Sequence, residues 1–203
     1  TLLDITATLE GRTTFLQVVE EVAAAISIPF TVGGGISDEK QVEKLLSKGA
    51  DKVSVNTAAL LDPGLISRLS AAFGNQCVVV AIDARLLQGN WEVVSHAGTR
   101  YTGIPALQWA RQACDMGAGE ILLTSFTADG TQQGFSLDIT ASISTAVPVP
   151  VIASGGAGNP QHFLDVFTKA SADAALAAGI FHYGQISIAE IKAFLKKNGV
   201  LVR

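Results

Sequence analysis

The sequence predicts an α/β fold: an open doubly wound sheet or, as an internal repeat favours, a (βα)8 TIM barrel. Three observations lead to this prediction. Short apolar, β-branched runs alternate with longer helical patterns along the 203 residues. The runs lack the polar alternation of half-exposed strands, as expected of parallel strands covered on both faces. One strand–helix–strand pattern also occurs twice in the chain.

Seven segments have the composition of buried strands. They are Leu2–Thr6, Phe30–Gly34, Lys52–Asn56, Val78–Asp83, Glu120–Ser125, Val149–Ser154 and Asp173–Ala178. Gly89-Asn90 separates Arg85–Gln88 from Trp91–His96, and this spacing predicts a hairpin after the fourth strand. A complete barrel has eight strands and about 250 residues, so we expect this chain to be about one βα unit short.

Capping residues mark the ends of the helices between these strands. Asp62 before Pro63 predicts a helix start, and Gly74 predicts its end. The other signals are capping-box spacings at Asp38/Gln41 and Ser187/Glu190, and glycine stops at Gly49 and Gly199.

The internal repeat predicts how the chain is organised. Val32–Ile36 and Ala153–Ala157 each end a strand on glycines, and each is followed by a helix and by an Ala-Asp pair before the next strand. The two copies align at an offset near 121 residues. Applied to the strand that ends at Asp83, this offset places a partner about 38 residues before Thr1. We therefore expect one domain over 1–203, made of a truncated half-barrel (1–75) and a second half (76–203), without the first strand and helix.

Composition excludes several classes of protein. Hydrophobic residues make up 48% and charged residues 16%, which excludes disorder. A net charge of −4 gives no support to nucleic-acid binding, and no apolar run is long enough to span a membrane. Cys77 and Cys114 lie in apolar segments and predict buried thiols of a reduced, cytoplasmic protein. The three histidines share no metal-ligand spacing, so we expect neither a metal nor another cofactor.

Two glycine-rich turns are the candidate anion sites. Gly33–Gly35 and Gly155–Gly158 each follow a strand and precede a helix, where backbone N–H groups attract phosphate. Asn56-Thr57 and Ala178-Gly179 end the next strand in each copy and could add donors. The pair predicts two phosphate sites at one mouth of the barrel. The alternative is that these glycines only form tight βα turns.

Asp83 is the candidate general acid/base, because it ends an otherwise apolar strand and a buried carboxylate needs a compensating partner. The alternative is a turn cap. Asp4 has a similar setting, with a structural role equally open, and Asp129-Gly130 indicates a turn that faces the mouth. Lys52 and Glu120 open two strands at the opposite face, where charges are usually solvated or paired.

Several stretches carry a resemblance to a known family. They are Leu3–Ala7, Ile28–Ile36, Gly49–Ala58, Val78–Ala84, Gly117–Ser125, Asp129–Thr131 and Ile152–Gly158. Over essentially its whole length, the chain resembles the cyclase subunits of imidazole glycerol phosphate synthase, from histidine biosynthesis.

The resemblance implies a barrel that binds a bisphosphorylated ribulosyl aminoimidazole carboxamide intermediate. Such a cyclase, a lyase, uses ammonia from a glutaminase subunit on the N-terminal face to form imidazole glycerol phosphate. Asp83 matches one of two catalytic aspartates. The residues that match binding positions are Gly35, Asn56 and Thr57 at one phosphate, Asp129, Gly130, Gly156, Ala178 and Gly179 at the other, and Thr124 at the substrate. Asp51, Lys52 and Glu120 match the partner-facing rim and the ammonia entrance.

Departures from the family pattern keep alternatives open. The family's other catalytic aspartate, part of its ammonia gate and its closing loop belong to the first unit and have no match here. Within the second phosphate region the departing residues are Thr127, Ala128, Gln132, Ser136 and Gly179. The chain is therefore expected to be a cyclase whose first unit lies elsewhere and which is inactive or weak alone, a phosphate-binding protein without acid/base catalysis, or an assembly protein. In the last case the edges at Leu2–Thr6 and Asp173–Ala178 would pair in a homo-oligomer.

Overall fold

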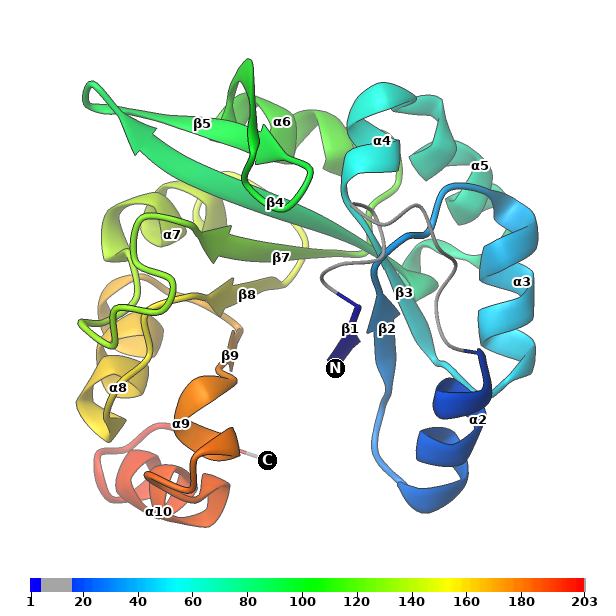
Figure 1. Cartoon of the computed structure of the whole chain (residues 1–203). Coiled ribbons are helices and arrows are strands. Elements are labelled where there is room, and N and C mark those ends of the chain that lie inside the picture. The colour runs from blue at the N-terminus through cyan, green and yellow to red at the C-terminus, as the bar shows by residue number, and fades with distance from the viewer. Residues whose placement is uncertain (5–15, 203) are drawn as a thin grey trace.

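The computed structural model describes residues 1–4 and 16–202. In this part of the chain the parallel strands follow the order β1-β2-β3-β4-β7-β8-β9. Figure 1 shows these strands in an arc with helices on its outer side, and with β1 and β9 at the two ends of the arc. The α/β barrel architecture predicted from the sequence is confirmed.

All seven predicted strands are present among the described residues, several of them shorter than predicted. Their bounds are β1 (Leu2–Leu3), β2 (Thr31–Gly33), β3 (Lys52–Val55), β4 (Val78–Leu87), β7 (Glu120–Ser125), β8 (Val151–Ser154) and β9 (Ala174–Leu176). The predicted strand at Leu2–Thr6 continues beyond the described residues, which omit 5–15. The parallel register places Val53 beside Val78 and Ile121 beside Val151, so the sheet buries continuous rows of branched side chains.

The predicted hairpin is confirmed and has an additional strand. β4 runs on to Leu87 and pairs antiparallel with β5 (Asn90–Ser95), which in turn pairs with β6 (Arg100–Pro105). β6 was not predicted, because it contains Gly103 and Pro105, residues that are depleted in strands.

The helices have the following bounds: α2 (Leu16–Ala25), α3 (Glu39–Ser47), α4 (Thr57–Leu61), α5 (Gly64–Phe73), α6 (Ala106–Asp115), α7 (Leu137–Ser144), α8 (Pro160–Lys169), α9 (Gly179–His182) and α10 (Ile188–Lys197), with a 3-10 turn at Asn75–Cys77. The Ser187/Glu190 capping box is present as predicted. Asp38 caps α3 by accepting from the Gln41 N–H, but the Gln41 side chain accepts from the Ser37 N–H instead of closing the box on Asp38.

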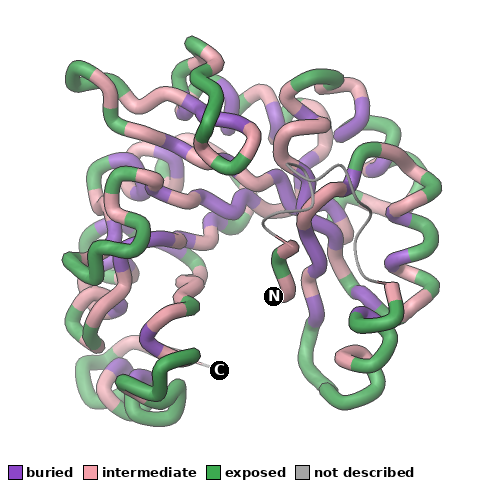
Figure 2. The backbone as a smooth tube through the Cα atoms, viewed as in Figure 1, coloured by how far each residue is buried: buried purple, intermediate pink, exposed green. Residues whose placement is uncertain are grey.

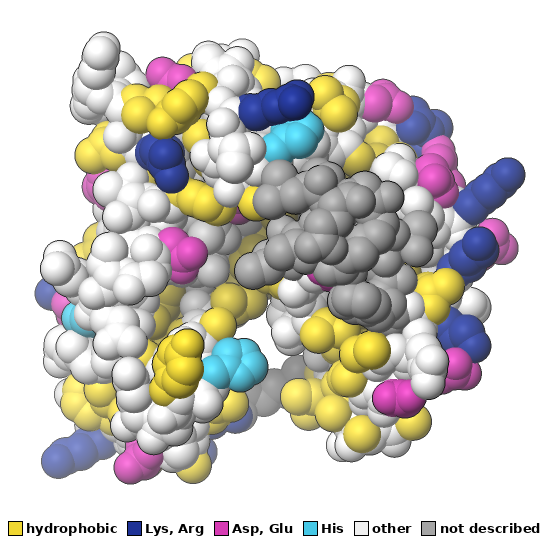
Figure 3. Space-filling model, in the orientation of Figure 1, with side chains coloured by type: hydrophobic (Ala, Val, Ile, Leu, Met, Phe, Trp, Pro, Cys, Tyr) yellow, Lys and Arg dark blue, Asp and Glu magenta, His cyan; other side chains and the backbone are white. Residues whose placement is uncertain are grey.

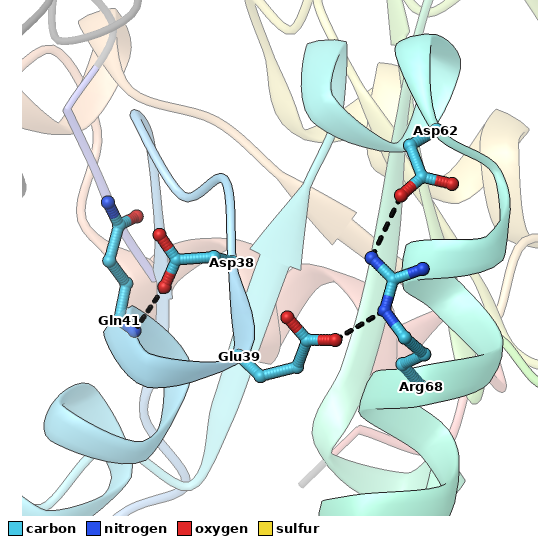
Figure 4. A network of polar contacts seen from close by, with 5 residues as sticks. All are labelled: Asp38, Glu39, Gln41, Asp62 and Arg68. Atoms are coloured by element: carbon cyan, nitrogen blue, oxygen red, sulfur yellow. Dashed lines mark hydrogen bonds and ion pairs between the residues drawn. The ribbon is translucent and has the colours of Figure 1, made fainter.

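The prediction that Asp62 caps a helix is wrong. α5 begins at Gly64 after Pro63, which has no side chain able to cap, while the Asp62 carboxylate pairs with Arg68 at 2.8 Å. Figure 4 shows Arg68 reaching Asp62 and also Glu39 of α3. These ion pairs lower the pKa values of Asp62 and Glu39, and they link α3 to α5 at the surface.

The core lies between the sheet and its outer helices, as the buried segments in Figure 2 indicate. A smaller cluster joins β8 to α8 and α10 through Phe163, Val166 and Leu195. Fully burying a side chain of this kind contributes roughly 1.5–3 kcal/mol. Cys77 and Cys114 are free but only half-buried, so the prediction of buried thiols is wrong in degree. Burial is sufficient to raise the pKa of the Cys114 thiol to about 11, helped by the Asp115 charge.

Candidate active site

The carboxyl ends of the parallel strands gather the site residues predicted from the sequence. Asp83 of β4 lies in register with Thr124 of β7 on one side and with Val94 of β5 on the other. Thr124 is in turn in register with Ser154, just before the second glycine turn. This edge is where chemistry is found in barrels of alternating strands and helices.

Asp83 is the most perturbed carboxyl group of this edge. Its Oδ2 atom accepts a hydrogen bond of 2.8 Å from Asn56 Nδ2. Burial raises the pKa of Asp83 to about 6; the Asn56 hydrogen bond opposes this shift, and the negative charge of Asp129 adds to it. A carboxyl group that titrates near neutral pH can accept and return a proton under working conditions.

The first glycine turn lies directly after β2. Gly34 and Gly35 have φ values of +105° and +68°, and a Cβ on Gly34 would lie 2.2 Å from the carbonyl oxygen of Asp4. The Asp4 N–H donates to the Gly33 carbonyl at 2.9 Å. The close approach of β1 therefore requires glycine here, which accounts for the turn without any ligand.

Asn56 and Thr57 connect this region to the hairpin. Thr57 begins α4, and its Oγ1 atom accepts from the His96 N–H at 3.2 Å. His96 has φ +52°, an unusual conformation for a residue other than glycine. His96 was considered only as a metal ligand from the sequence, and no sequence signal indicated its contact with Thr57.

The second glycine turn is covered by the loop after β7. Gly155 and Gly156 have φ values of +90° and +96°. The Gly134 N–H donates to the Gly156 carbonyl at 2.7 Å, and a Cβ on Gly156 would lie 2.1 Å from the Gly134 oxygen. A Cβ on Gly155 would lie 3.3 Å from the Asp129 Cβ atom, so this loop brings Asp129 to the turn.

Asp129 and Gly130 form the predicted turn. The Asp129 N–H donates to the Ser125 carbonyl at 2.9 Å, and Gly130 has φ +76°. The influence of Asp129 on the pKa of Asp83 places this turn within electrostatic reach of the candidate acid/base. Ala178 and Gly179 stand at the start of α9, where the Ala178 carbonyl accepts from the N–H groups of Phe181 and His182.

Three of the residues that depart from the family pattern have local partners. Thr127 Oγ1 accepts from the Leu86 N–H at 3.0 Å, and the Ser136 hydroxyl lies 2.7 Å from that of Ser125. Gln132 Nε2 donates to Gln185 Oε1 at 3.2 Å. These contacts attach the loop after β7 to the hairpin, to its own strand and to the segment after α9.

The opposite face carries the predicted rim residues. Lys52 and Glu120 form an ion pair across the starts of β3 and β7, with side chains 27% and 18% exposed. Asp51 Oδ2 accepts from the Phe30 N–H at 2.7 Å, so its carboxylate joins the starts of two strands. A cavity of about 390 Å³ adjoins this face, lined by residues that include Ala23, Ile28 and Asp51.

Metal and membrane features can be stated for the described residues. Over 1–4 and 16–202 there is no group of three or more His, Cys, Asp or Glu side chains placed to hold a metal ion. No helix in the same part of the chain is long and apolar enough to cross a bilayer.

Comparison with known proteins identifies the family of this chain. Residues 1–187 match the family model described as "Histidine biosynthesis protein". The chain is 55% identical over 203 residues to "Imidazole glycerol phosphate synthase subunit HisF" of Geobacillus kaustophilus, covering 99% of this chain and 81% of the relative. The protein of the same name from Metallosphaera sedula is 55% identical over 201 residues, covering 99% and 80%. The chain therefore belongs to the histidine biosynthesis protein family.

Proposed function

We infer that this chain performs the cyclase role in histidine biosynthesis. The observation that carries this inference is about 55% identity, over 99% of the chain, to subunits named as parts of imidazole glycerol phosphate synthase. The reaction joins ammonia to a bisphosphorylated ribulosyl aminoimidazole carboxamide intermediate, and it releases imidazole glycerol phosphate, an aminoimidazole carboxamide ribotide and water. No observation on the described residues favours the alternative of a binding protein without catalysis.

Asp83 is the residue we assign to proton transfer. It lies on β4 at the carboxyl edge of the parallel strands, is half-buried, and has a pKa raised to about 6. Ring closure requires the attacking ammonia to lose protons and the departing oxygen to gain them. A carboxyl group poised near neutrality can do both in turn.

The two glycine turns are assigned to the phosphate groups of the substrate. Gly35, Asn56 and Thr57 serve one end, while Asp129, Gly130, Gly156, Ala178 and Gly179 serve the other, with Thr124 between them. The support is that both turns follow parallel strands at one edge of the sheet and lead into helices. Because the two glycine turns occupy equivalent places in their strand–helix–strand units, they also support the proposed division into half-barrels at 1–75 and 76–203.

A glutaminase subunit is the partner we propose for the N-terminal face. The Lys52–Glu120 ion pair there marks the proposed ammonia entrance, and Asp51 lies at its rim beside the cavity. Among the described residues β1 and β9 are the end strands of the sheet, and Figure 3 shows a hollow in the molecule with hydrophobic side chains on both sides. These edges support a second proposal, that two copies associate through these strands. We place the reaction in the cytoplasm, in keeping with two free cysteines.

An ammonia-dependent cyclisation assay tests the function directly. Ammonium salt replaces the glutaminase, and formation of imidazole glycerol phosphate is followed. Asp83→Asn should lower kcat by about 10²- to 10⁴-fold, because it removes a proton-transfer group. Asp115→Asn, an exposed change at the end of α6, is the matched control and should leave the rate unchanged. An Asp83→Asn variant as active as the unmodified chain would remove Asp83 from the mechanism.

A further inference from the structure

The side chain of Asn56 has an arrangement that helix capping does not explain, and that a phosphate contact through the Asn56 backbone N–H would not explain either. It precedes α4, yet its side chain makes no capping hydrogen bond to that helix. Its Nδ2 atom instead donates to Asp83 Oδ2 at 2.8 Å. The amide therefore points at the candidate acid/base rather than at the backbone donors around the predicted phosphate site.

The other half of the same amide is equally informative. Asn56 Oδ1 is buried and, within the described part of the chain, has no hydrogen-bond partner. Leaving a buried acceptor without a partner is costly, and such groups in native structures call for an explanation. The orientation of this amide is thus set by the Nδ2 hydrogen bond to Asp83, and not by a hydrogen bond to Oδ1.

We propose that Asn56 is a positioning residue for Asp83, holding the carboxylate as a proton acceptor and, by turning its amide, also holding the protonated acid. With Asp83 ionised, Nδ2 donates to Oδ2, as observed. When Asp83 takes up a proton, a half-turn of the terminal amide exchanges Nδ2 for Oδ1. The free acceptor then receives the new O–H, and the carboxyl group keeps its place in both states. The inference deepens the proposed function, since it rests on the acid/base role of Asp83.

Among the described residues, the hydrogen bond from Asn56 is the one side-chain hydrogen bond recorded for Asp83. β3 and α4 contribute Val55 and Thr57 beside Asn56, and β7 contributes Thr124 in register. Two ionisable residues of adjoining elements have other contacts: the His96 N–H donates to Thr57, and the Arg85 guanidinium lies against Tyr101 and Phe126. Asp129 acts on Asp83 through its charge, which favours the protonated form. Asn56 opposes that influence by direct donation.

The test is an NMR titration that requires no turnover. The Asp83 carboxyl carbon and the Asn56 side-chain NH₂ group are followed from pH 4 to 9 in the unmodified chain. The Asn56 signals should change with the same midpoint as the Asp83 carbon. Asn56→Leu keeps the branched outline of the side chain and removes both of its hydrogen bonds to Asp83. Because the bond to the charged carboxylate is the stronger of the two, the Asp83 midpoint should rise by roughly 1 pH unit.

Two further variants keep the test decisive. Asn56→Asp retains the shape and places a second carboxylate beside Asp83, so the upper midpoint of the pair should also rise by roughly 1 unit or more. Asn198→Ala is the matched control, since it removes another Asn Nδ2 donor at 2.8 Å, to the Phe194 carbonyl at the end of α10. It should leave the Asp83 midpoint unchanged.

The outcomes separate this inference from the proposed function. An unmoved Asp83 midpoint in both Asn56 variants, or Asn56 signals that ignore the Asp83 titration, would overturn the positioning role even if cyclisation proceeds. Coupled titration without any cyclisation would support the pairing and count against the reaction instead. In the active protein, Asn56→Leu should also move the acidic limb of the kcat profile upward, whereas Thr57→Val should change KM and leave that limb in place.

Discussion

Two strand–helix–strand units, β2-α3-β3 and β8-α8-β9, are built by the same local rules. Each has two consecutive glycines with positive φ after its first strand, Gly34-Gly35 and Gly155-Gly156. In each, the carboxylate before or at the start of the second strand accepts from a backbone N–H at the start of the first: Asp51 from Phe30, and Asp173 from Val151. The frame is shared down to single hydrogen bonds.

The units differ where the second strand ends. Asn56 follows β3 and extends an amide to Asp83, whereas the matching position after β9 is Ala178, which has no polar side chain. The frame and the chemistry are therefore separable. The repeated residues fix the backbone, and the non-repeated side chain of Asn56 connects one unit to Asp83, the proposed acid/base.

The largest effect should come from filling the glycine turns. Gly34→Ala and Gly156→Ala each place a Cβ about 2 Å from a backbone oxygen and retain a positive φ. Each should destabilise the fold by about 2–5 kcal/mol, measured by urea unfolding. Gly179→Ala is the control, because no atom lies within 4 Å of its added Cβ. A large loss of unfolding free energy in one of the two variants and none in the other would show that the two glycine turns are not built by the same rules.

Asp83 should make stability depend on pH. Its folded pKa of about 6 lies above the ordinary aspartate value of 3.8, so the folded state holds an extra proton between these pH values. Stability therefore falls as pH rises through this window, by up to about 3 kcal/mol. Asp83→Asn abolishes that loss and should be more stabilising at pH 8 than at pH 4. If the difference in unfolding free energy between Asp83→Asn and the unmodified chain were the same at pH 4 and pH 8, the raised pKa of Asp83 would be contradicted.

The smallest effect concerns the two matched carboxylates. Asp51→Ala and Asp173→Ala each remove an acceptor from a backbone N–H, at 2.7 and 2.9 Å. Each should cost about 1–3 kcal/mol in thermal or urea unfolding, and the two costs should agree closely. A clearly larger cost at Asp51 would show that its position at the proposed rim adds something beyond the shared frame.

The strands of the parallel sheet could be predicted from their apolar composition. The partner of the Asp62 side chain and the strand β6 could not. Branched apolar runs such as Val78–Ile82 are stable only where both faces of a strand are covered, so they located the strands along the chain. Asp62 was misplaced because a carboxylate before proline suits a helix cap, yet Arg68, one turn and a half further on, competes for it. β6 was missed because its pairing with β5 supplies stability that its own composition does not.

The site was predictable in its membership more than in its contacts. Strand ends converge in any parallel barrel, so Asp83, Thr124 and the glycine turns could be assigned to one edge. The amide of Asn56 could not be assigned to Asp83, because the choice between a backbone donor and a carboxylate depends on a few ångströms of strand register. His96 was equally hidden, since it reaches Thr57 through its backbone N–H.

Asp83 sits where β4 is hydrogen-bonded as a strand to two neighbours of opposite direction, β7 and β5. Main-chain pairing on both flanks fixes the backbone of this residue, so its Cα atom cannot shift without breaking strand hydrogen bonds. Sequence changes in the loops outside the sheet should therefore leave the backbone position of the proposed proton-transfer group unchanged.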